Sequence, residues 1–111
     1  MPDPQDPGLD AAIAALWRDA QPRALERVAI LEAAVTALAD DALAPESADA
    51  ARREAHKLAG SLGTFGLPAG TEHARVIERA LDAGAGPGDA PVLAGAVADL
   101  RTVVEAGRQG A

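Results

Sequence analysis

ARREAHKLAGSLGTFGLP, residues 51–68, is the stretch that decides the fold class. Its apolar residues recur at intervals of 4, 3, 4 and 3 positions, which is the period of an amphipathic α-helix. Glycine suits the end of a helix and proline suits the start of the next one, so Gly66 and Pro68 mark where this helix ends. The apolar stripe consists of Ala51, Ala55, Leu58, Leu62 and Phe65. The pattern predicts a helix that packs one face against other helices and leaves the opposite face in water.

The same helical period extends through most of the chain, and no sustained strand-like alternation interrupts it. Asp6 and Pro7 have the chemistry of a helix start, and Pro22 is expected to end a short first helix and begin a longer one. The glycine-rich residues 84–88 predict a loop. The expected helices cover residues 6–21, 22–43, 47–66, 68–83 and 89–107. We therefore expect an all-α, antiparallel four-helix bundle with a short additional N-terminal helix over residues 6–107, between a disordered leader (1–5) and a disordered tail (108–111).

The composition narrows the class of function. Alanine occupies 29 of 111 positions and the only aromatic residues are Trp17 and Phe65, which favours helices over strands. The absence of cysteine excludes disulfides, thiolate metal sites and cysteine nucleophiles, and a net charge of −7 argues against a nucleic-acid partner. The acidic, proline-rich N-terminus does not resemble a signal peptide, and no apolar run approaches the roughly 20 residues that span a bilayer. We expect a cytoplasmic protein that binds neither nucleic acid nor a membrane.

His56 lies one step outside the apolar stripe, and the residues at i+3, i+4 and i+7 from it are the small Ala59, Gly60 and Gly63. A glycine inside a helix costs about 1 kcal/mol relative to alanine, so a chain this rich in alanine is expected to need these glycines. They either let a neighbouring helix pack closely or leave a flat strip on which another protein can bring a reactive group to the imidazole. Gly63 and Gly66 also fit a simpler role, because both lie near the end of the helix.

The segment from His56 to Gly66 resembles the motif of the histidine-containing phosphotransfer (HPt) domain family. That motif is a histidine, a variable residue, an aliphatic residue, usually a lysine, then a glycine and a small residue, with further glycines downstream. The positions in register are His56, Leu58, Gly60, Ser61 and Gly66, and Gly63 matches a frequent variant. Ala59 stands where the family usually has the lysine. The motif is local, while the order and lengths of the expected helices agree with the family over nearly the whole chain.

The resemblance implies that His56 is the phosphoryl acceptor of a two-component phosphorelay. Its Nε2 would take the group from the aspartyl phosphate of a response-regulator receiver domain, or from a histidine kinase, and pass it to another receiver. The receiver would supply the aspartate, a lysine and Mg²⁺, so we expect a carrier without a cofactor, metal or ATP site of its own, and not an enzyme by itself. The apolar stripes of the four helices can close on one another without a second subunit, so we also expect a monomer. The residues expected to support His56 or to contact the partner are Arg52, Arg53, Lys57, Ala59, Gly60, Ser61 and Gly63.

The alanine at position 59 removes a cation from beside the expected phosphoryl group. Arg52 and Arg53 lie one helical turn before His56 on its side of the helix, whereas Lys57 points about 100° away. We therefore expect one of the two arginines to offset more of the phosphoryl charge than Lys57 does.

Two other functions fit the same residues less completely. A protein-binding bundle could use the same face without phosphorylation, and an acid-labile, base-stable phosphate on the chain would distinguish the two. A dimerising histidine-kinase core usually has an acidic residue after its histidine, and Lys57 occupies that position here. The second histidine, His73, is expected in the core or at its boundary, and the two histidines lack the spacing of a zinc site.

Overall fold

The computed structural model describes residues 7–107 of the 111-residue chain. Within that range it contains four α-helices, one 3₁₀ turn and no β-strand, and the predicted all-α bundle is confirmed. The elements are α1 (Pro7–Ala39), α2 (Pro45–Thr64), α3 (Pro68–Asp82), η1 (Pro87–Asp89) and α4 (Ala90–Ala106). The expected leader at 1–5, the helix cap at Asp6 and the tail at 108–111 lie outside the described residues. None of the helices in residues 7–107 is both long enough and apolar enough to cross a membrane.

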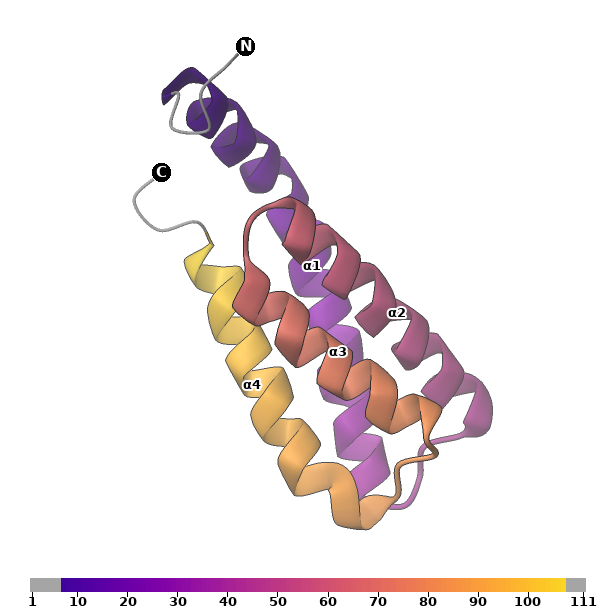
Figure 1. The fold of residues 1–111 in the computed structure, drawn as a ribbon. Helices are drawn as coiled ribbons and strands as arrows, with labels where there is room; N and C mark the ends of the chain where they lie inside the picture. The colour runs from indigo at the N-terminus through magenta and orange to yellow at the C-terminus, as the bar shows by residue number, and fades with distance from the viewer. Residues whose placement is uncertain (1–6, 108–111) are drawn as a thin grey trace.

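Successive helices run in opposite directions and surround one core (Figure 1). α2 packs along α3 and α1 packs along α4, while further contacts join α1 to α2 and α3 to α4. Short connections allow this arrangement, because each helix turns back directly onto its neighbour in the sequence. The expected loop at 84–88 is shorter than predicted, since Pro87 and Gly88 belong to η1, and Gly84 begins it in the left-handed conformation (φ 79°).

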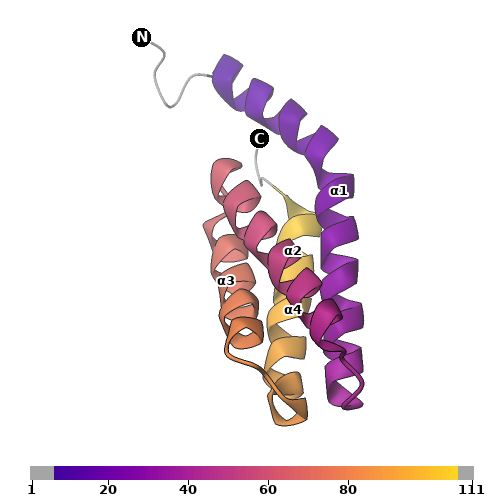
Figure 2. The ribbon, with the colours of Figure 1, turned by 90° about the vertical axis from the view of Figure 1, so that its right-hand side faces the viewer.

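The first helix differs from the prediction because α1 continues through Pro22. The prediction of a separate short N-terminal helix is therefore wrong. Pro22 has no N–H to donate to the carbonyl of Arg18 and its ring crowds the preceding turn, so the helix changes direction instead of ending (Figure 2). Contacts next to the proline hold the helix in place: Trp17 is only 4% exposed, and Gln21 Nε2 donates to the carbonyl of Val104 at 2.8 Å. Tertiary packing thus overrides a local helix breaker.

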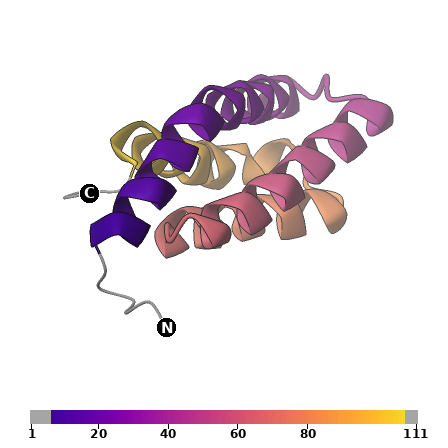
Figure 3. The same ribbon diagram turned by 90° about the horizontal axis from the view of Figure 1, so that it is seen from above.

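The core fills the space between one pair of helices, α2 and α3, and the other pair, α1 and α4 (Figure 3). The predicted stripe of α2 is confirmed at its first four positions, which are fully buried. The fifth, Phe65, is partly buried and meets Trp17 edge to face with 5.2 Å between ring centroids. The largest fully buried side chains are Val28, Leu31, Leu58, Leu62, Ile77, Leu93, Leu100 and Val104.

α3 approaches α2 closely at Gly70. A Cβ on this residue would lie 2.7 Å from Cδ1 of Leu62 and 3.1 Å from Cγ1 of Val103, so glycine is needed for the helices to come this close. Thr71, the next residue, donates its hydroxyl to the carbonyl of Ala59 at 2.8 Å. These contacts fix the register of α3 against α2 and so decide which side chains of α3 lie beside the exposed face of α2.

Candidate functional site

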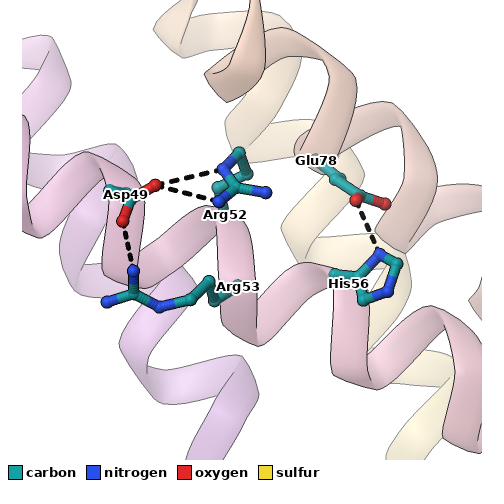
Figure 4. A network of polar contacts seen from close by, with 5 residues as sticks. All are labelled: Asp49, Arg52, Arg53, His56 and Glu78. Carbon is teal, nitrogen blue, oxygen red and sulfur yellow. Dashed lines mark hydrogen bonds and ion pairs between the residues drawn. The ribbon is translucent and has the colours of Figure 1, made fainter.

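His56 projects from α2 with 69% of its side chain exposed. Its Nδ1 lies 2.7 Å from Oε2 of Glu78, a residue of α3 (Figure 4). The Glu78 side chain is only 19% exposed, so its carboxylate lies between the helices while the imidazole stands outside them. The two residues are 22 positions apart and meet because α2 and α3 pack side by side. The sequence motif pointed to His56, whereas Glu78 was missed because its role depends on the register of two helices.

The contact with Glu78 determines which nitrogen of His56 is free to react. An ionised carboxylate can only accept a hydrogen bond, so the contact favours the tautomer in which Nδ1 carries the hydrogen and donates a hydrogen bond to Glu78. In the neutral ring the lone pair is then on Nε2. Nε2 has no hydrogen-bond partner among residues 7–107, and it lies on the edge of the ring away from Glu78 (Figure 4). The arrangement presents one nucleophilic nitrogen to an approaching molecule.

Glycines leave the surface next to His56 flat. Gly60 is exposed, and a Cβ built on it would meet no atom within 4 Å, so close helix packing does not explain this glycine. Gly63 is also exposed, and a Cβ there would make an ordinary contact of 3.4 Å with Oγ1 of Thr71. Gly66 has φ 73° and forms the turn after α2, which is the helix-ending role considered for it. The flat strip beside His56 consists of Gly60 and Gly63.

Ala59 does not lie on this strip, contrary to the expectation that it contacts a partner. It is only 2% exposed, and its carbonyl accepts the hydrogen bond from Thr71 of α3. The reason is helical geometry: three residues advance a helix by about 300°, which turns Ala59 about 60° from His56 toward the core. Ala59 therefore belongs to the packing between α2 and α3.

Arg52 and Arg53 are both paired with Asp49, which precedes them on α2 (Figure 4). Arg52 Nη2 lies 2.9 Å from Oδ1 of Asp49, and Arg53 binds the other carboxylate oxygen. The hydrogen bond from Arg52 lowers the pKa of Asp49, and the same bond raises the pKa of Arg52. Both guanidinium groups are thus bound on the N-terminal side of His56, and Arg52 also lines a polar groove with Glu78 of α3. Their expected role in offsetting phosphoryl charge stays a prediction.

Two shallow grooves flank the exposed face of α2. Lys57 and Ser61 line a groove between α1 and α2, where Lys57 Nζ lies 3.9 Å from Oε1 of Glu54. On the other flank a polar groove runs along α3. Its lining residues are Arg52, Arg75, Glu78, Arg79 and Asp82. His56 stands beside this second groove, because Glu78 both lines the groove and binds the imidazole.

His73 is partly buried on α3, as expected for a residue at the core boundary. It precedes Glu78 by five positions, which places it about 140° around α3 from the side that meets His56. Among residues 7–107, no group of three or more His, Cys, Asp or Glu side chains is arranged to hold a metal ion. Of the two histidines, His56 is the one that combines exposure with small neighbours.

Comparison with known proteins identifies the family of the chain. No curated protein and no solved structure matches the chain. A family model described as Hpt domain matches residues 15–110, a range that contains α2, α3 and α4 together with most of α1. Both members of the contact, His56 and Glu78, lie inside the matched range. With most of its length matched, the chain belongs to the Hpt domain family.

Proposed function

We propose that the chain is a histidine phosphocarrier of a two-component phosphorelay, in which Nε2 of His56 carries the phosphoryl group. The observation that carries the proposal is the 2.7 Å contact between Nδ1 and Glu78, made by a ring that is 69% exposed. Membership of the Hpt domain family implies histidine phosphotransfer. The geometry supports it with a nucleophile of defined tautomer that a second protein can reach.

The bonds that form and break in the transfer involve only the imidazole of this chain and the aspartyl phosphate of a receiver domain. The lone pair of Nε2 forms the N–P bond while the P–O bond to the aspartate breaks, and the aspartate carboxylate leaves with the bonding electrons. Positive charge then develops on the ring, which keeps its Nδ1 proton. Because that proton points at Glu78, the Glu78 carboxylate stabilises the phosphorylated ring. The reverse step on another receiver returns the group to an aspartate.

The partner supplies the rest of the chemistry in this proposal. We expect a receiver domain to contribute its aspartate, a cation and Mg²⁺, with a histidine kinase as the other possible donor. The flat strip of Gly60 and Gly63 leaves room for such a domain, and Lys57 and Ser61 are expected to contact it from the neighbouring groove. The chain itself would act in the cytoplasm as a monomer, without a cofactor of its own and without turning over a substrate alone.

Labelling of the chain by a phosphorylated receiver domain tests the proposal. His56→Gln should abolish labelling and leave the helical fold intact, because the side chain is exposed. His73→Ala is the matched control and should still be labelled. The phosphate should be acid-labile and base-stable, as expected for a phosphohistidine. Persistent labelling of His56→Gln would overturn the assignment, and a wild-type chain that binds receivers but accepts no phosphate would show that the face serves binding alone.

A further inference from the structure

A phosphoryl group on His56 would place up to about two negative charges at the edge of α2, where both nearby arginines of α2 already have a carboxylate partner. Arg52 and Arg53 are bound to Asp49, and the free nitrogen of the imidazole lies on the side of the ring away from both arginines (Figure 4). Lys57 lies on the flank that faces α1. A cation that could neutralise a phosphoryl group on Nε2 would therefore come from the neighbouring helix, α3.

α3 carries such a residue at Arg75. Two hydrogen bonds define the register of the antiparallel helices: Thr71 binds Ala59 at 2.8 Å, and Glu78 binds His56 at 2.7 Å. Arg75 follows Thr71 by four residues and precedes Glu78 by three, so all three lie on one face of α3. A rise of 1.5 Å per residue puts Arg75 about 4.5 Å along the helix axis from Glu78, toward Ala59. The free edge of the imidazole lies on the side away from Arg52 and Arg53 (Figure 4), and because both arginines precede His56 on α2, that side is the one toward Ala59.

Arg75 is also available to a ligand. It is exposed, and no carboxylate in residues 7–107 lies within ion-pair distance of its guanidinium group. It lines the polar groove that Glu78 shares. The other arginine of α3 in that groove, Arg79, comes after Glu78 and therefore lies toward Asp82, on the side away from the free edge of the ring.

We propose that Arg75 binds the phosphoryl group carried by His56, an inference that rests on the proposed function. A guanidinium group presents a planar fork of N–H donors that matches two phosphoryl oxygens. Residue 59 is a buried alanine and supplies no positive charge. A cation from α3 therefore takes the place of one from α2. Two residues on consecutive turns of α3 then have different roles. Glu78 binds Nδ1 of the ring, and Arg75 neutralises the charge of the phosphoryl group on Nε2.

Phosphoramidate tests Arg75 without a partner protein. As this donor phosphorylates His56, Nε2 forms the N–P bond, the P–N bond of the donor breaks, and ammonia leaves with the bonding electrons. With the 111-residue chain at low salt, Arg75→Gln should be labelled about tenfold more slowly, which corresponds to ~1.4 kcal/mol of activation free energy. The matched control Arg79→Gln, with the same loss of charge from the same groove, should stay near the wild-type rate. Arg75→Lys should recover part of the rate, and high salt should reduce the difference.

Each other outcome counts against Arg75. Equal rates for Arg75→Gln and Arg79→Gln, a larger loss in Arg52→Gln, or a lower melting temperature with an unchanged rate would overturn the inference. The proposed function would still stand in these cases, provided that labelling requires His56. A wild-type chain labelled by a phosphorylated receiver but not by phosphoramidate would also overturn it, because the chain would then bind no phosphoryl group by itself. If no donor labels the wild type, both proposals fail together.

Discussion

Glu78 and His56 are bound across two helices, so a side chain of α3 orients the exposed imidazole ring of α2. Oε2 of Glu78 lies 2.7 Å from Nδ1, and the opposite edge of the ring is open. A ring held in this way needs no rearrangement before it meets a phosphoryl donor. The second helix is therefore part of the site, although the histidine motif lies wholly on the first.

Glu78→Ala should slow phosphorylation of His56 more than Glu78→Gln does. A glutamine oxygen can still accept a hydrogen bond from Nδ1–H and keep the tautomer, whereas alanine leaves Nδ1 to water. Hydrogen bonds to charged groups contribute about 1.5–3 kcal/mol, and exposure of the ring puts this one at the low end, so we expect a loss of about tenfold for alanine. The rate of labelling by a phosphorylated receiver measures the loss, and ¹⁵N NMR of the imidazole reports the tautomer. A wild-type rate in Glu78→Ala would show that the contact does not orient the nucleophile.

Gly60→Gln should separate stability from function. A better helix former replaces glycine in open space, so the free energy of unfolding should stay equal or rise by roughly 0.5–1 kcal/mol. The long side chain would lie next to His56, and both receiver binding and phosphotransfer should fall sharply. Gly60→Ala is the control, expected to gain stability and keep transfer. Thermal melts beside labelling rates test this, and a destabilised Gly60→Gln would contradict the open surface at this position.

Gly70→Ala should lower the stability of the fold and leave phosphorylation of His56 in place, the opposite of the result expected for Gly60→Gln. Its Cβ would lie 2.7 Å from Leu62, so α3 must move away from α2 or the leucine must change rotamer. Overpacking of this kind costs about 1–3 kcal/mol. The melting temperature should fall while the folded fraction still accepts phosphate on His56. If urea unfolding shows no loss of stability, α3 has room to shift without cost.

The ion pair between Arg101 and Glu32 predicts a dependence of stability on pH. Arg101 Nε and Nη2 reach the two carboxylate oxygens of Glu32 at 2.7 and 2.8 Å, which joins α4 to α1. The hydrogen bond from Arg101 lowers the pKa of Glu32 below its ordinary 4.5. A carboxyl group of this kind stabilises the fold above its unfolded pKa, and that contribution is lost as the pH falls through the folded pKa.

Glu32→Gln should therefore be less stable than the wild type at neutral pH, by about 0.5–1 kcal/mol because the pair is partly exposed. The difference should shrink as the pH is lowered through and below 4.5. Melting curves of both chains across this range measure it. If the difference in stability between the two chains stays constant below pH 4.5, the effect of the substitution does not come from the charge of Glu32.

The fold class was predictable because helical periodicity is local information. The buried stripe of α2 could be identified from spacing alone, as could the helix end at Gly66. Pro22 was misjudged because its effect is not local: the packing of Trp17 and the hydrogen bond of Gln21 to α4 keep α1 helical around it. A proline does not end a helix when neighbouring residues of that helix make tertiary contacts that keep it helical.

Some residues of the candidate site could likewise be identified from local sequence, and others depend on how the helices pack. His56 and Gly60 were visible because they belong to one motif on one helix. Ala59 was misplaced because a residue three positions from an exposed histidine can face either the core or solvent until the partner helix is known. Glu78 and Arg75 could not be identified, since the position of α3 along α2 depends on contacts of Gly70 and Thr71 that helical periodicity does not show.

The open space around Gly60 also bears on how proteins of this fold diverge. One face of α2 is closed into the core by residues such as Leu58 and Leu62, while Gly60 and His56 stand on a face that takes no part in that packing. In the proposed function, substitutions on the exposed face would change the surface that a receiver domain contacts without disturbing the helices beneath. Duplicated copies of this chain could therefore acquire different partners, one exposed residue at a time, while the bundle that holds the histidine stays the same.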